Sequence, residues 1–340
     1  MGCALSSIVF QPPSFPSTIP KSDVIELQTK HNSKIAGLHV ELNSEITVVV
    51  SHGNAEDLGM ISKWAMDFAR QLQVNVLCYD YDGYGHSEGT PTEIGCYNDI
   101  DAVLEYLTAP PPLGKGVDVQ SIVFFGRSLG SGPTCYMAQK LSLAGTPPAG
   151  VVLQAPLLSA LRVALDLRYT FQCDMFPNVH RVRDFRTPTL IIHGTHDEIV
   201  PFWHGERLFF TLPPQYRARP LWVHGAGHNN IEAVLRQDGA FYDGLKDFLD
   251  EHCRRQWKQN VENAFQVRQV RQGVRGKGKG GEHASRKKGS MDMMKRTPTR
   301  GTGASVANAA TKARHGGANA SFARGAIVKS RTSGTQRLKT

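Results

Sequence analysis

Short apolar runs that alternate with longer helical segments are the feature that most constrains the fold of this chain. Strands are predicted at residues 46–50, 74–80, 121–125, 150–155, 188–193 and 221–223. Helices are predicted at residues 57–72, 92–108, 131–143 and 230–250. This alternation predicts an α/β fold with a mostly parallel, doubly wound sheet and flanking helices. In such sheets, ligands bind on loops at the carboxyl ends of the strands.

The pentapeptide GRSLG (126–130) directly follows one predicted strand and directly precedes a predicted helix. A sharp strand-to-helix turn forces its middle residue, Ser128, into a strained conformation and lifts the hydroxyl above the sheet. Side chains at Gly126 and Gly130 would collide with neighbouring backbone, so both positions require glycine. The context predicts that Ser128 is a nucleophile; the alternative is a structural turn with an idle serine.

A serine hydroxyl needs a base to become a nucleophile, and the base needs an orienting acid. In this fold class both partners follow the serine along the chain. The loop after the strand at 188–193 offers two carboxylates, and we predict Asp197 as the acid and Glu198 as a surface charge. The glycine-rich loop after the last strand offers His228 as the base. His224 is expected to belong to the strand and to point into the packing of the sheet.

Two histidines four residues apart, His224 and His228, resemble a metal-binding pair. That spacing places both on one face only in a helix, and Gly225 and Gly227 argue against a helix here. No nearby carboxylate completes a zinc signature. We therefore expect neither a metal nor another cofactor.

Acyl transfer passes through a tetrahedral oxyanion, which backbone N–H groups stabilise. One donor is predicted to be the amide of Leu129, which follows the nucleophile. The other is expected from the loop after the first core strand, where Gly53 lets the backbone approach closely, and we assign it to Asn54. The alternative for this loop is an ordinary strand exit.

Only residues 156–187 lie between the strands predicted at 150–155 and 188–193. This excursion is too short for a lid domain, so we predict a minimal cap. Its apolar stretch LLSALRVAL (157–165) is most simply a core-packed helix, and a wall for an acyl chain is the alternative.

The chain begins Met1-Gly2-Cys3-Ala4-Leu5-Ser6, which fits the N-myristoylation pattern. Removal of Met1 would expose the amine of Gly2, and Cys3 would be a thiol open to palmitoylation. One myristoyl chain binds membranes only marginally, so a second acyl chain or a basic patch is needed for stable anchoring. The alternative is that Met-Gly is simply a common start.

Basic side chains are concentrated in the C-terminal part. Residues 254–340 hold 21 Lys and Arg against 3 Asp and Glu, whereas residues 1–253 hold 18 against 27. The tail is predicted to be disordered, because its composition buries too little apolar surface to offset the entropy of ordering. We favour a membrane-supporting role over an inert tail, and the scarcity of stacking aromatics disfavours nucleic acid.

The six cysteines are widely spread and form no CxxC pair, which predicts a reducing, cytosolic compartment. Cys78 and Cys135 sit in apolar stretches and are predicted to be packed thiols. No apolar run approaches the roughly 20 residues of a membrane-spanning helix. Together with the acylation pattern, this predicts a lipid-anchored protein at the cytoplasmic face of the plasma membrane or of endosomes.

Three parts of the chain are predicted from these patterns. Residues 1–20 form an acylated anchor with a proline-rich spacer, residues 21–253 form the catalytic domain, and residues 254–340 form the basic tail.

These residues, in this order, resemble the α/β-hydrolase superfamily, and more closely the α/β-hydrolase domain-containing protein 17 family. The resemblance covers roughly residues 8–252. It includes segments beyond the shared catalytic motifs, such as SHGNAEDLG (51–59), YDYDGYGHSEG (79–89) and LQAPLLSALRVA (153–164).

The resemblance implies an α/β-hydrolase fold and a membrane-anchored serine hydrolase that removes palmitate from S-acylated membrane proteins. Ser128, Asp197 and His228 would be its nucleophile, acid and base. The family's amino terminus typically carries a cluster of palmitoylated cysteines, whereas only Cys3 stands near the start here. The basic tail has no counterpart in the family pattern. A lipase or esterase acting on acylglycerols or small esters, and an inactive scaffold that binds lipidated proteins or nucleic acid, are the alternatives.

Overall fold

The computed structural model describes residues 9–164 and 174–254, to which every structural statement below refers. Gly2, Cys3, the tail beyond residue 254 and the centre of the cap excursion lie outside these residues. The predictions made for those segments therefore stay predictions, as do the three domain boundaries.

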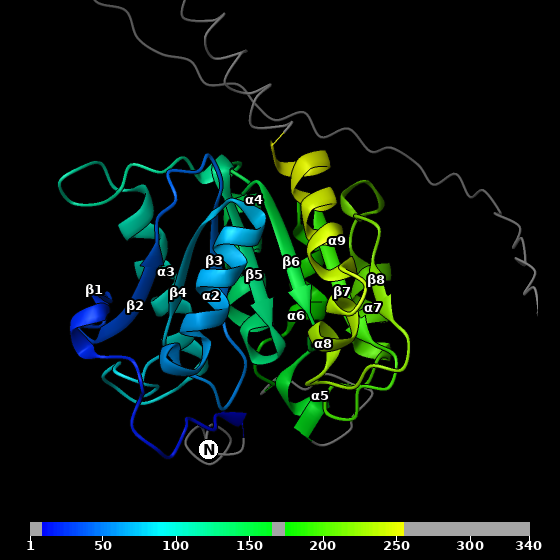
Figure 1. The fold of residues 1–340 in the computed structure, drawn as a ribbon, viewed down its shortest axis with the longest axis horizontal. Coiled ribbons are helices and arrows are strands. Elements are labelled where there is room, and N and C mark those ends of the chain that lie inside the picture. The colour runs from blue at the N-terminus through cyan, green and yellow to red at the C-terminus, as the bar shows by residue number, and fades with distance from the viewer. Residues whose placement is uncertain (1–8, 165–173, 255–340) are drawn as a thin grey trace, which may run out of the picture. The chain divides into compact units, whose positions relative to one another are not determined.

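One eight-stranded sheet forms the centre of the fold, in the order β1-β2-β4-β3-β5-β6-β7-β8 (Figure 1). The six strands β3 to β8 run parallel to one another, and at one edge β2 pairs antiparallel with β4 and β1 pairs antiparallel with β2. The six predicted strands are β3 (Thr47–Ser51), β4 (Asn75–Tyr79), β5 (Ile122–Arg127), β6 (Gly150–Gln154), β7 (Thr189–Gly194) and β8 (Leu221–Val223). The predicted mostly parallel α/β sheet is thereby confirmed.

The edge strands β1 (Ile25–Gln28) and β2 (Lys34–Val40) were not predicted. β1 is only four residues long and its burial alternates weakly, and β2 carries Gly37 at its centre. β1 is too short and β2 is interrupted by its glycine, and neither contains a β-branched run like that of β3. The pairing of β2 with β4 and of β1 with β2 supplies what their own sequences do not.

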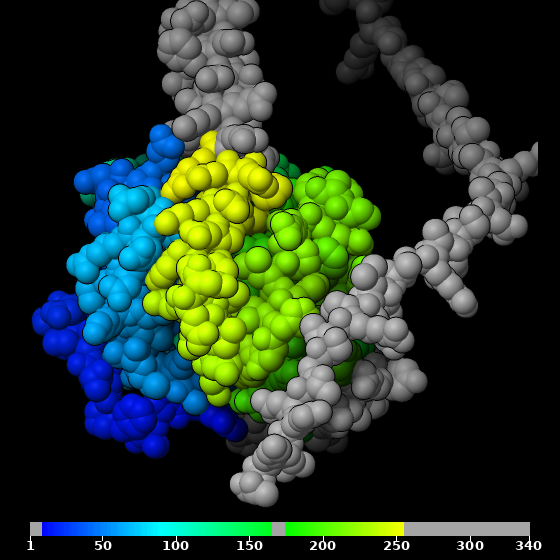
Figure 2. Space-filling model, turned by 45° about the vertical axis from the view of Figure 1, so that its right-hand side comes forward, coloured from blue at the N-terminus to red at the C-terminus, as the bar shows by residue number. Residues whose placement is uncertain are grey.

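Helices cover both faces of the sheet because side chains alternate along each strand. Val48 and Val50 pack under helices α2 (Leu58–Leu72) and α9 (Ala240–Phe248), which Figures 1 and 2 show side by side. Val49 packs on the opposite face. That face is covered by α3 (Glu93–Thr108), α4 (Ser131–Leu143), α6 (Asn178–Arg181) and α7 (Trp203–Thr211).

The predicted helix at 230–250 is not continuous. Helix α8 (Ile231–Arg236) ends before Gly239, whose φ of +82° belongs to the left-handed region, and α9 begins at Ala240. A helical turn of π type (Leu249–Arg254) follows α9. The helix breaks at this glycine because, without a Cβ, it adopts the left-handed conformation at little energetic cost.

The cap is small, as predicted, and its described part contributes the short helices α5 (Ala160–Ala164) and α6. Leu157, Leu158 and Leu161 are buried, and the first two belong to the core clusters on the α3–α7 face. None of the three lines the cleft beside Ser128. The described part of this stretch therefore packs in the core, as predicted.

Residues 9–20, which we call the strap, lie against the domain. Val9, Phe10 and Ile19 are buried. The carbonyl of Ile19 lies 2.8 Å from Nε2 of His86, and Ser17 and Thr18 lie against Gly59 at the start of α2. The strap is thus fixed at both ends, and its proline-rich centre is mostly exposed.

Cys78 and Cys135 are free and fully buried, which confirms that they are packed thiols. Burial raises the pKa of the Cys135 thiol to about 12, so it stays protonated and unreactive at neutral pH. Over the described ranges, no helix combines the length and the apolarity required to span a membrane.

Replacement of Phe68 by Ala tests the packing of α2. Phe68 is buried between Trp64 and Phe125, so the resulting cavity should lower the free energy of unfolding by about 3–5 kcal/mol. Met66→Ala, at an exposed position of the same helix, should change it by less than about 0.5 kcal/mol. Urea titration measures both values, and equal destabilisation by the two changes would contradict this account of the core.

Candidate active site

Ser128 occupies a sharp turn between β5 and α4. Its φ of +51° lies in the left-handed region, which is uncommon for a residue with a side chain. A Cβ on Gly126 would lie 2.6 Å from the carbonyl oxygen of Gly130, and one on Gly130 would lie 2.0 Å from that of Ser51. Both distances are too short for any side chain, so the two glycines are required for the steric reason expected from the sequence.

The structure brings Ser128, His228 and Asp197 into one hydrogen-bonded chain. Nε2 of His228 lies 3.0 Å from Oγ of Ser128, and Nδ1 lies 2.8 Å from Oδ2 of Asp197. A neutral imidazole with its proton on Nδ1 satisfies both contacts, because Nδ1–H then donates to the carboxylate and Nε2 accepts from the hydroxyl. This arrangement prepares Nε2 to take a proton from the serine.

Asp197 is buried and held from several sides. Its Oδ1 accepts hydrogen bonds from the backbone N–H groups of Ile199 and Val200, at 3.0 and 2.8 Å. Burial raises the pKa of Asp197, but hydrogen bonds from His193 and His228 outweigh it and hold the pKa below its ordinary value. The carboxylate therefore remains charged at neutral pH, where it can stabilise a protonated His228.

One sequence expectation about the histidine loop was wrong. His224 lies beyond the end of β8 and is exposed, so it does not point into the sheet. Glu198 is exposed, as expected of a surface charge, and its Oε2 also accepts the backbone N–H of His228 at 3.2 Å. The only sign of this contact in the sequence was the position of a second carboxylate next to the predicted acid.

The oxyanion loop, His52 to Ala55, follows β3 at the same edge of the sheet. The N–H of Gly53 donates to Oε2 of Glu56 at 2.9 Å and is therefore occupied. The amide of Asn54 is the next one along the loop, and Ala55 takes the left-handed φ of +55°. Asn54 and Leu129 stay the predicted oxyanion donors.

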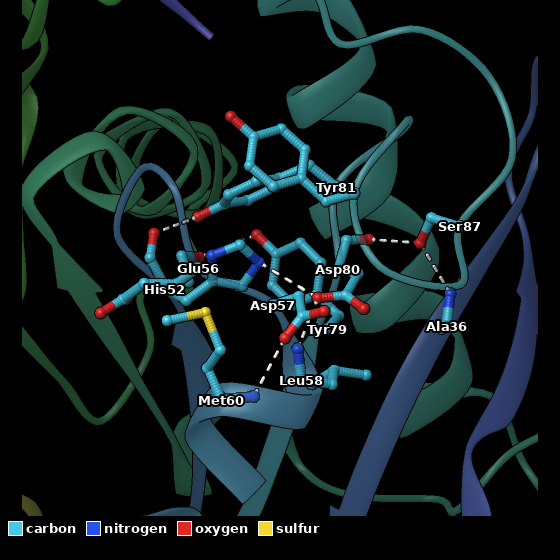
Figure 3. A network of polar contacts seen from close by, with 12 residues as sticks. Ala36, His52, Glu56, Asp57, Leu58, Met60, Tyr79, Asp80, Tyr81 and Ser87 are labelled. Carbon is cyan, nitrogen blue, oxygen red and sulfur yellow. Dashed lines mark hydrogen bonds and ion pairs between the residues drawn. The ribbon is translucent and has the colours of Figure 1, made fainter. Parts of the chain in front are cut away.

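A buried polar network lies beneath this loop (Figure 3). Nε2 of His52 lies 3.4 Å from Oδ1 of Asp80, and the hydroxyl of Tyr81 donates to the carbonyl of His52 at 2.7 Å. Oδ1 of Asp80 also accepts the N–H of Leu58 at the start of α2, at 2.8 Å. These bonds tie the first half of the oxyanion loop to α2 and to the residues that follow β4.

An ion pair that sequence reasoning missed joins the two halves of the site. The guanidinium of Arg127, which precedes the nucleophile, contacts the carboxylate of Glu56 and lies 3.9 Å from Glu232 on α8. Burial raises the pKa of Glu56, yet Arg127 holds it below its usual value, so Glu56 stays charged. Because Glu56 also binds the N–H of Gly53, the pair links the nucleophile turn to the oxyanion loop.

A cleft of about 720 Å³ opens beside Ser128 and His228. Its lining mixes acidic, basic and apolar side chains. The Oε1 of Gln154 is buried there and has no hydrogen-bond partner among the described residues. The other lining residues are Gln11, Gly53, Asn54, Ala55, Glu56, Lys63, Trp64, Asp67, Arg127, Ile199, Asn229, Glu232, Ala233 and Arg236.

The sheet order, the turn at Ser128 and the hydrogen-bonded serine, histidine and aspartate define an α/β hydrolase. Residues 43–168 match the family model described as "Serine aminopeptidase, S33", and residues 164–256 match the "Prolyl oligopeptidase family". The solved structure of the Pyrococcus furiosus esterase Pf2001 aligns with a TM-score of 0.57 at 19% identity, over 72% of this chain and 99% of that chain. At this identity the likeness supports the fold alone.

Curated relatives identify the family. Alpha/beta hydrolase domain-containing protein 17B of Homo sapiens is 36% identical over 237 residues, which span 68% of this chain and 77% of that protein. Protein aho-3 of Caenorhabditis elegans is 39% identical over 61% of this chain and 58% of its own length. Protein 17C of Mus musculus is 38% identical over 61% of this chain and 60% of its own length. The chain belongs to the alpha/beta hydrolase domain-containing protein 17 family.

Replacement of His228 by Ala tests whether the imidazole activates Ser128. Fluorophosphonate probes react with activated serines, so the wild type should be labelled at Ser128, and His228→Ala should lower the labelling rate by about a hundredfold or more. His224→Ala removes the same group at an exposed position four residues earlier and should be labelled at the wild-type rate. Equal labelling of the two variants would exclude His228 as the base.

Proposed function

We propose that this protein is a serine hydrolase that cleaves fatty acyl thioesters from S-palmitoylated membrane proteins. The observation that carries the proposal is the contact of Ser128 with His228, which in turn contacts the charged Asp197. The thioester preference rests on the resemblance to the protein 17 family, and the membrane setting rests on the acylation pattern at Gly2 and Cys3.

In the acylation step, Oγ of Ser128 attacks the thioester carbonyl carbon while Nε2 of His228 takes its proton. The carbonyl π electrons move to oxygen, which accepts hydrogen bonds from the amides of Asn54 and Leu129. Collapse of this intermediate breaks the carbon–sulfur bond. The cysteine thiolate leaves and receives the proton from His228, and an acyl-serine remains.

In the deacylation step, His228 takes a proton from water, and the resulting hydroxide attacks the acyl-serine. Collapse of the second intermediate returns the proton to Ser128 and releases the fatty acid. Asp197 keeps the imidazole in the required tautomer and stabilises its charged form in both steps. A thiolate is a good leaving group, so this reaction depends less on protonation of the leaving group than amide hydrolysis does.

A comparison of two acyl substrates tests the reaction and its specificity. The wild type should hydrolyse a palmitoyl-cysteine peptide in preference to a monoacylglycerol. Ser128→Ala should lower kcat for the peptide by several orders of magnitude, because it removes the attacking oxygen. Release of palmitate measured by mass spectrometry is the readout.

The result can contradict the proposal in two separate ways. Normal turnover by Ser128→Ala would refute the nucleophile. A clear preference for the monoacylglycerol by the wild type would favour a lipase and refute the thioester specificity.

We further propose that acyl chains on Gly2 and Cys3 hold the enzyme on the membrane that carries its substrates, with the basic tail adding affinity for anionic lipids. Two anchoring signals are needed because a single myristoyl chain binds only marginally. Under this proposal the S-acylated proteins are substrates and nucleic acid is not a partner.

Gly2→Ala tests the anchor, because an alanine at this position cannot take the place of the myristoylated glycine. The variant, expressed in cells as the full chain, should move from the membrane pellet to the supernatant. Ala4→Gly, which leaves the pattern intact, should remain in the pellet. Unchanged partitioning of Gly2→Ala would exclude N-myristoylation as the anchor.

A further inference from the structure

We propose that residues 9–11 of the strap are a positioning element of the active site, which holds the oxyanion loop through the carboxamide of Asn54. This inference rests on the proposed acyl transfer at Ser128. The N-terminal segment would then act in catalysis in addition to any part that it plays in anchoring.

The carboxamide of Asn54 joins the loop to the strap with two hydrogen bonds. Its Nδ2 donates to the carbonyl of Val9 at 2.6 Å, and its Oδ1 accepts the N–H of Gln11 at 3.0 Å. The hydroxyl of Tyr84 donates to the same Oδ1 at 2.7 Å and lies 3.2 Å from the N–H of Gln11. The side chain of Asn54 is therefore fixed in a three-way junction of loop, strap and domain.

The strap is held firmly enough to serve as a support. Phe10 is only 4% exposed, and its ring meets the edge of Phe176 with centroids 6.0 Å apart. Val9 is buried in the same cluster. The carbonyl of Val9 and the N–H of Gln11, which bind Asn54, lie next to these two side chains in the chain. Burial of the side chains therefore fixes both backbone groups in place.

The loop needs support at this particular point. Its earlier residues are fixed to the domain, since His52 contacts Asp80 and Gly53 binds Glu56. The predicted donor is the amide of Asn54 itself, and the next residue, Ala55, is held in a left-handed conformation that costs about 1 kcal/mol or more. Without the strap, Tyr84 would be the only described residue that holds the Asn54 side chain, and the loop could relax from this conformation.

This role predicts a specific kinetic signature. An oxyanion donor acts in the transition state and hardly at all on the bound substrate, so its displacement lowers kcat and leaves KM nearly unchanged. Misplacement of a catalytic group by about 1 Å costs about a hundredfold in rate. We therefore expect losses of about ten- to one-hundredfold in kcat when the strap is loosened.

Two matched pairs of variants test the proposal in the full-length, unacylated protein, where membrane anchoring plays no part. Phe10→Ala removes the buried ring, and Phe15→Ala removes the same ring from a position that is 53% exposed in the same strap. Gln11→Pro removes the N–H that binds Asn54, whereas Gln11→Ala removes the same side chain and keeps that N–H. Within each pair, the ratio of the two kcat values measures the effect of the contact between the strap and Asn54.

The assay uses a soluble p-nitrophenyl acyl ester, with kcat normalised to the number of sites that react with a fluorophosphonate. Affinity for a trifluoromethyl ketone, which binds as a tetrahedral oxyanion, and for the product fatty acid is measured in parallel. Phe10→Ala and Gln11→Pro should lose kcat and ketone affinity by the same factor, with KM and fatty-acid affinity unchanged. Phe15→Ala should match the wild type.

Three results would overturn the proposal. In the first, Phe10→Ala and Gln11→Pro have the same kcat per active site as their control variants, Phe15→Ala and Gln11→Ala. The strap would then have a purely structural role. The second is a rise in KM with kcat unchanged, which would make the strap part of the substrate cleft instead. The third is a wild type that hydrolyses neither ester nor thioester, which overturns the proposed function as well. A wild type active on the ester alone would refute only the thioester specificity.

Discussion

The close approach of Gly130 to the end of β3 is the contact on which the site depends. With no side chain at Gly130, the turn after β5 comes within van der Waals contact of the carbonyls of Ser51 and His52. That contact sets Ser128 directly beside the loop that carries Asn54, one of the two predicted oxyanion donors. The neighbouring parallel strands β3 and β5 fix it further, because they end at the same edge of the sheet.

The residues of the site that the sequence predicted share one property: each follows a recognisable strand and has a distinctive chemical type. Ser128 stands between two glycines that are required for steric reasons. His228 and Asp197 lie on loops whose order along the chain is fixed by the fold. Glu56 and Arg127 had no such signal, because nothing local to either residue indicates a partner 71 positions away. The same holds for β1 and β2, which gain their strand conformation from pairing, and for the strap, whose proline-rich sequence is typical of a spacer.

Each charged group at the site has a polar or oppositely charged side chain beside it. Asp197 faces two histidines, and Arg127 lies between Glu56 and Glu232, which in turn accepts hydrogen bonds from Trp64 and Arg236. Breaking one partner of a buried pair leaves an uncompensated charge, so such groups hold their positions strongly. The cleft therefore presents a fixed, mixed polar surface to a substrate.

The two ends of the described chain lie at opposite ends of the parallel strands. Gln11 lies at the cleft, on the edge where the strands end, whereas Cys253 packs against Gly150, where β6 begins. Because an extended chain spans at most about 3.6 Å per residue, the Cα atom of Cys3 lies within roughly 22 Å of that of the buried Val9. If Cys3 is acylated as proposed, this short connection holds the cleft close to the bilayer and favours acylated cysteines near its surface.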